Sequence, residues 1–147
     1  MRSRNPISGF TLIELMIVVG IVAVLAAIAY PAYTQFIMQG NRTDATKTLQ
    51  LAAQSLERCY STTFNYSGCI VNGIAMFDNS TMQTPNLFYT ITFSIPDAQD
   101  YSLVAVPVAA PQTNDTQCVR FTLLSTGQQT AQDNLAGNTT QTCWGSN

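Results

Sequence analysis

The sequence predicts an α+β fold in which one long N-terminal helix packs on a meander antiparallel sheet of about four strands. Three patterns in the 147 residues support this fold class: an apolar opening segment, a following stripe of apolar residues at helical spacing, and alternating apolar and polar residues further on. A helical period in one block and a period of two in the next indicate one helix followed by consecutive strands.

The first expected element is an apolar helix between Phe10 and Tyr33. Before its tyrosines, this segment of 24 residues has only Thr11 and Glu14 as polar side chains. A helix of this length measures about 36 Å and can cross a hydrocarbon core of roughly 30 Å. The nine residues before it carry two arginines and no acid. Because basic flanks stay in the cytoplasm, we expect the remainder of the chain to be exported.

The helix is expected to continue past Pro31 as an amphipathic segment. Pro31 lacks a backbone N–H and should kink the helix or open it locally without ending it. Beyond the proline, apolar residues recur at steps of four and three, at Ala45, Leu49, Ala52, Leu56 and Cys59. One face of this segment should therefore lie on the sheet, and the whole helix should run from about Phe10 to Tyr60.

The sheet is expected after residue 86. Residues 87–95, LFYTITFSI, alternate apolar and polar side chains, and the turn PDAQD follows them. Residues 101–108 and 117–124 give two further strands, and a turn at Gly127 leads to a fourth short strand or an extended tail. Residues 61–86 have no convincing period and are expected to form a linker loop between helix and sheet.

Composition argues against several classes of function. The net charge is −2 and the pI about 4.7, so the chain has no basic field to hold nucleic acid, which we do not expect as a partner. The sequence contains no histidine and no evident acid/base pair. We therefore expect no enzymatic activity, no cofactor and no metal.

The four cysteines are even in number and absent from the apolar segment, which is typical of disulfides in an oxidising compartment. Three connectivities are open. We favour Cys59 with Cys69 and Cys118 with Cys143, since each pair closes a local loop. Zinc is the alternative, although none of the spacings is the close one that zinc sites prefer.

Two interpretations of the apolar segment compete. A secretory signal peptide also has a basic start and an apolar core, and cleavage after Ala29 in Ala27-Ile28-Ala29 would release a soluble protein beginning at Tyr30. Glu14 argues against this interpretation. A carboxylate within an apolar core costs about 2.5 to 3.5 kcal/mol on insertion scales, and a disposable signal has no use for it.

The basic leader MRSRNPISG followed by FTLIELMIVVGIVAVLAAIAYPAY resembles the prepilin signature of type IV pilins and of the related type II secretion pseudopilins. The resemblance implies that a prepilin peptidase cuts after Gly9 and that Phe10 becomes the methylated N-terminus. It also implies a role for Glu14 in subunit assembly, where the carboxylate meets the N-terminal ammonium of a neighbouring subunit. The family has a proline at the place of Pro31.

A second, more scattered similarity covers the C-terminal half. The run DTQCVRFTLLSTGQQ and the final Cys143-Trp144 resemble the end of the PilE-type minor pilins, where a disulfide ties the last segment to the sheet. ERCYSTTFNY, after the helix, also resembles that group, whereas residues 70–87 are least supported. Trp144 is expected to pack on the core beside the disulfide; an exposed ligand anchor is the alternative.

The resemblance implies a type IV pilin-like fold with three parts. These are a leader peptide at 1–9, a transmembrane and filament-core helix at 10–33, and a periplasmic head at 34–147. The head would comprise the amphipathic half of the helix, the 61–86 loop, and a sheet with a C-terminal disulfide region at 87–147.

The expected function is that of a structural subunit of a type IV pilus, a minor pilin needed for assembly, with adhesion or twitching motility downstream. The alternatives are a pseudopilin, a surface-binding pilin (an adhesin or a DNA-uptake pilin), and, remotely, the soluble secreted protein. Expected partners are prepilin peptidase, other pilin subunits and the inner-membrane assembly machinery. The protein would sit in the bacterial inner membrane before assembly and in the extracellular pilus afterwards.

Replacing the leader's last residue, Gly9→Val, should leave an unprocessed precursor in the inner membrane, because the bulkier side chain stands at the expected cleavage position. An immunoblot that resolves precursor from mature protein checks this prediction. Normal maturation of the variant would show that the chain is cut elsewhere.

Overall fold

The computed structural model describes residues 10–145. These residues fall into two compact units, an N-terminal unit that ends at Phe36 and a C-terminal unit that begins at Ile37. The expected leader, with Gly9, lies outside the described residues.

The N-terminal unit is the first part of α1, the helix Leu12–Thr63. The Thr11 hydroxyl oxygen accepts a hydrogen bond from the backbone N–H of Glu14 at 3.3 Å, which satisfies one of the free donors at the helix start. The helix continues through Pro31. Within residues 10–145, α1 is the one helix long and apolar enough to cross a membrane, judged by length and composition.

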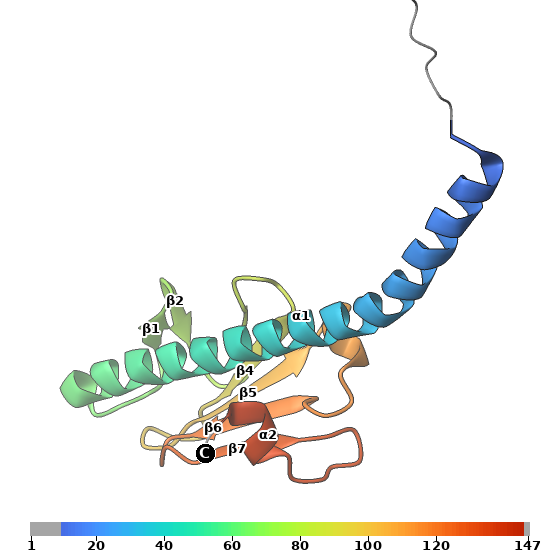
Figure 1. Ribbon diagram of the computed structural model, residues 1–147. Coiled ribbons are helices and arrows are strands. Elements are labelled where there is room, and N and C mark those ends of the chain that lie inside the picture. The colour runs from blue at the N-terminus through green and yellow to red at the C-terminus, as the bar shows by residue number, and fades with distance from the viewer. Residues whose placement is uncertain (1–9, 146–147) are drawn as a thin grey trace, which may run out of the picture. The chain divides into compact units, whose positions relative to one another are not determined.

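The C-terminal unit combines the second part of α1 with two sheets (Figure 1). A hairpin consists of β1 (Cys69–Val71) and β2 (Ile74–Met76). A five-stranded antiparallel meander follows, in the order β3 (Thr81–Gln83), β4 (Tyr89–Ser94), β5 (Ser102–Pro107), β6 (Arg120–Leu124) and β7 (Gln129–Gln132). A 3₁₀ turn, η1 (Gln112–Asn114), precedes β6, and the short helix α2 (Thr140–Trp144) follows β7.

One core joins α1 to the meander. The predicted stripe supplies Ala45, Leu49, Ala52 and Leu56, all buried. The alternation predicted for β4 is present as well, because its inward side chains are buried and the intervening ones are only partly so. The expected α+β fold is thereby confirmed.

The segment 61–86 is more regular than the predicted linker loop. The helix continues to Thr63, and β1, β2 and β3 occupy much of the remainder. Strands of three residues are too short to display a period of two, so the sequence pattern missed them. The tight turn of the hairpin has positive φ at both Asn72 and Gly73, a pattern typical of a type I′ turn.

Two disulfides tie the end of α1 and the short helix α2 to other parts of this unit. Cys59 in α1 is bonded to Cys69 in β1, and Cys118, before β6, is bonded to Cys143 in α2. These are the pairs that the sequence favoured. Trp144 packs its ring edge-to-face on Phe121, and its Nε1 donates a hydrogen bond to a β7 carbonyl at 2.9 Å. The side chain of Trp144 therefore lies against the core.

A buried ion pair fastens α1 to the chain before β6. Arg42 donates to both carboxylate oxygens of Asp115, from Nε at 2.6 Å and from Nη2 at 2.7 Å. Asp115 is 3% exposed and also accepts hydrogen bonds from the Gln112 side chain and from two backbone N–H groups, those of Gln117 and Cys118. Burial opposes the charge of Asp115, but the arginine and the backbone donors outweigh it, so the pKa of Asp115 lies below its ordinary value.

Lowering the pH should therefore weaken the fold through Asp115. A carboxyl whose pKa is lower in the folded than in the unfolded state contributes stability above its unfolded pKa of 3.8, and this stability is lost as the pH falls through the folded value. Asp115→Asn should be less stable than wild type at neutral pH, and the two should converge as the pH falls from 3.8 through the lower, folded pKa of Asp115. Denaturant titration of the detergent-solubilised protein across this range measures the effect.

Asp97→Asn is a suitable control, since Asp97 lies exposed in the β4–β5 turn. A constant difference in unfolding free energy between wild type and Asp115→Asn at every pH would show that the carboxylate charge contributes nothing.

Candidate functional site

The first candidate site is the exposed apolar surface of α1 in the N-terminal unit. The side chains of Phe10, Val18 and Phe36 are 87%, 51% and 72% exposed, and the apolar residues between them are similarly bare. No part of the most apolar stretch of this helix is buried. A lone helix of this kind has no core, so another apolar phase must cover it.

Glu14 interrupts this apolar surface in the first turn of α1. Its side chain is exposed, and within residues 10–145 it has no ion-pair partner. Phe10 lies two residues before the start of α1 and four positions before Glu14. The predicted site residues Phe10 and Glu14 thus lie at the same end of one helix, whereas Gly9 lies outside the described residues.

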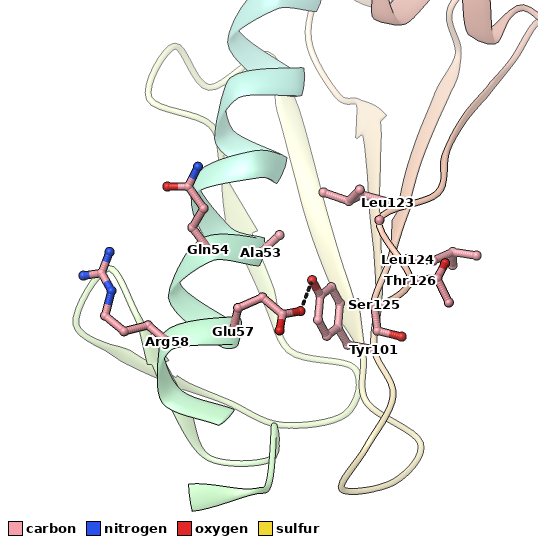
Figure 2. Close-up of a pocket in the computed structure, with 10 residues that line it drawn as sticks. Ala53, Gln54, Glu57, Arg58, Tyr101, Leu123, Leu124, Ser125 and Thr126 are labelled. Atoms are coloured by element: carbon pink, nitrogen blue, oxygen red, sulfur yellow. Dashed lines mark hydrogen bonds between the residues drawn. The ribbon is translucent and has the colours of Figure 1, made fainter. Parts of the chain in front are cut away.

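The C-terminal unit has an open groove between α1 and the β6–β7 turn, with a volume of about 560 Å³. Ala53, Tyr101, Leu123 and Leu124 contribute apolar atoms to its lining. Glu57 projects from α1 toward Tyr101 in this groove, while Arg58 extends from the helix in another direction (Figure 2).

The Glu57 carboxylate is held in place by two tyrosines. The Tyr66 hydroxyl donates to both carboxylate oxygens at 3.1 Å, and the Tyr101 hydroxyl donates to Oε1 at 3.0 Å. Burial, together with the hydrogen bond to the glutamate, raises the pKa of Tyr66 to about 12 and raises that of Tyr101 as well. Both hydroxyls thus remain protonated donors at neutral pH, and the carboxylate keeps a fixed position.

Sequence reasoning singled out neither the Glu57 cluster nor the Arg42–Asp115 pair. Glu57 and Tyr101 are 44 positions apart, so no local spacing links them. One sequence feature could have indicated Glu57. It follows Leu56, the last aliphatic residue of the buried stripe, and so stands at the edge of the face that packs on the sheet.

Curated relatives are similar to the N-terminal part of this chain. A fimbrial protein of Moraxella nonliquefaciens is 44% identical over 69 residues, 47% of this chain and 42% of that protein. The prepilin peptidase-dependent protein D of Escherichia coli K12 is 45% identical over 51 residues, 35% of each chain. A type IV major alpha-pilin of Moraxella bovis is 56% identical over 39 residues, 26% of this chain and 24% of its own. The chain thus spans less than half the length of these relatives.

Two family models match the chain. The prokaryotic N-terminal methylation motif matches residues 4–30. The model described as "Type IV minor pilin ComP, DNA uptake sequence receptor" matches residues 31–122, more than half of the chain. Together with the long helix α1, whose second part packs on the antiparallel sheet, this match shows that the protein belongs to the type IV minor pilin family.

Proposed function

We propose that the protein is a structural, non-enzymatic subunit of a type IV pilus. The observation that carries this proposal is the bare apolar surface of α1 with one carboxylate in its first turn. Such a surface suits lipid in the single subunit and the helices of neighbouring subunits in a filament.

Maturation would prepare this surface. Prepilin peptidase would cut after Gly9 on the cytoplasmic side, and the new N-terminus at Phe10 would be methylated. The methylation motif matched over residues 4–30 supports this step. The mature chain would remain in the inner membrane by α1 until the assembly machinery transfers it to the pilus, with its C-terminal unit in the periplasm.

Glu14 would then favour the position in which the subunit contacts its neighbour in the filament. A carboxylate in a low-dielectric environment is costly alone and tolerable beside an opposite charge. The N-terminal ammonium of a neighbour's Phe10 would supply that charge. The same residue would thus disfavour the isolated subunit and favour the assembled one.

The variant Glu14→Leu separates these two effects. Membrane insertion of the lone subunit should improve, because a cost of about 2.5 to 3.5 kcal/mol is removed. Incorporation into sheared pili should fail or fall steeply, because the incoming ammonium is left beside leucine, and an uncompensated buried charge costs about 3 to 5 kcal/mol. Cleavage after Gly9 should persist. Immunoblots of membranes and sheared filaments, in cells producing the other pilus components, measure all three.

Leu15→Ile is the matched control, since it alters an adjacent exposed residue of α1 without adding or removing charge. Incorporation of Glu14→Leu at the wild-type level would refute the charge-pairing role.

DNA capture is the second candidate function, and its support is the description of the matching family model. Charge gives it less support. The C-terminal unit has four basic residues, of which Arg42 is paired with Asp115; Lys47, Arg58 and Arg120 are exposed. A DNA site with only these three cations would depend mostly on uncharged side chains and backbone groups for its contacts.

If the protein binds double-stranded DNA through these three cations, the slope of log K against log salt should be about −2.7, from about 0.9 per neutralised phosphate. Binding of the purified full chain to labelled duplex DNA between 50 and 200 mM salt, conditions in which such slopes are measured, gives this value. A slope twice as steep would place the contacts elsewhere in the chain. Absence of binding would rule out DNA capture and leave the structural role as the remaining function.

A further inference from the structure

We infer that the groove at Glu57 receives the lysine side chain of a neighbouring pilin subunit. This inference rests on the proposed role as a filament subunit and deepens it, because it assigns a contact to the C-terminal unit in addition to that of Glu14.

The first support is the fixed carboxylate. Two hydroxyls at 3.0 and 3.1 Å hold the Glu57 side chain over the groove, although the residue itself is exposed. An exposed glutamate on a helix is ordinarily free to rotate, and ordering it costs side-chain entropy. Here the two tyrosines already order the Glu57 side chain within the subunit. Binding of a cation to Glu57 therefore costs less side-chain entropy.

The second support is the lack of a cation for this carboxylate. Among residues 10–145 the recorded salt bridge joins Arg42 to Asp115, and Glu57 has none. The adjacent Arg58 lines the groove but extends from the helix in a different direction (Figure 2). Acids outnumber bases in the C-terminal unit, where seven acidic residues face four basic ones: Asp44, Glu57, Asp78, Asp97, Asp100, Asp115 and Asp133 against Arg42, Lys47, Arg58 and Arg120. A basic group from a partner therefore complements the local charge.

The third support is the shape of the groove and its lining. The methylene stem of a lysine would lie along Ala53 and Leu123, with its ammonium at the carboxylate. Lysine suits the site better than arginine. The Tyr66 hydroxyl already spans both carboxylate oxygens, which obstructs a two-pronged guanidinium, whereas an ammonium needs only one remaining lone pair.

Carbodiimide treatment of sheared pili that contain the wild-type chain tests this contact. The reagent activates a carboxylate, a lysine amine in direct contact displaces it, and the carbodiimide leaves as its urea while an amide bond forms. The tryptic peptide TLQLAAQSLER, residues 48–58, has Glu57 as its only carboxylate side chain. Mass spectrometry should find this peptide joined to a lysine-containing peptide of an adjacent subunit.

Pili assembled from a mixture of ¹⁴N- and ¹⁵N-labelled copies of this chain distinguish a second copy from the same molecule. In a second copy the lysine would be Lys47, the chain's sole lysine. A product between Glu57 and Lys47 of one molecule would overturn the inference. So would an unmodified 48–58 peptide in pili whose other carboxylates are cross-linked.

Glu57→Gln supplies a second readout. The glutamine oxygen still accepts from the tyrosines, but the charge is gone. Incorporation into sheared pili should fall about two- to fivefold, the effect of one partly exposed ion pair, while the melting temperature stays close to that of wild type. Asp97→Asn, which also removes one charge and keeps the side-chain oxygen, should assemble normally.

Equal incorporation of Glu57→Gln and wild type would contradict the contact. The proposed function has its own test in Glu14→Leu. Pili that contain the chain but lack the Glu57 cross-link would refute only the lysine contact in the groove. Absence of the wild-type chain from pili would refute the filament role itself.

Discussion

The constraint on which the rest depends is the apolar surface of α1 between Leu12 and Phe36. At about 25 cal/mol per Å² of apolar area, exposing these side chains to water is prohibitive for a chain of ordinary stability. In the function we propose, lipid would remove that cost in the single subunit, and helices of other subunits would remove it in a filament. Glu14 would make these two environments unequal, because a carboxylate finds no partner in hydrocarbon but can meet a neighbour's ammonium. One residue in the first turn of α1 would then favour transfer of the subunit out of the membrane.

The C-terminal unit has a core that includes none of that surface. The stripe from Ala45 to Leu56 is buried against the meander, and the disulfides and the Arg42–Asp115 pair hold the remaining segments to it. A separate core would matter for a subunit that leaves the membrane, because that core stays buried when the surroundings of α1 change. The ordered Glu57 carboxylate follows from the same packing. Tyr66 and Tyr101 are themselves core residues, so their hydroxyls aim at a fixed point on the edge of α1.

The fold was predictable where a pattern persists over many residues. The apolar segment, the stripe that begins at Ala45 and the alternation in β4 each repeat long enough to indicate their element. The hairpin β1–β2 and strand β3 escaped prediction because each strand has three residues, and the sheet gained a fifth strand as a result. At the N-terminus the site residues Phe10 and Glu14 came from an unbroken local motif. The Arg42–Asp115 and Glu57–Tyr101 contacts join residues 73 and 44 positions apart, which sequence spacing alone cannot reveal.

The state of the mature N-terminus tests most directly whether α1 stays with the protein in the filament. Sheared filaments should contain this chain, and its intact mass and N-terminal sequence should begin at methylated Phe10. The complete apolar helix, Glu14 included, would then be present where subunits meet. A chain that begins at Tyr30 and is found only as soluble protein would contradict the account, because the surface on which assembly depends would have been removed.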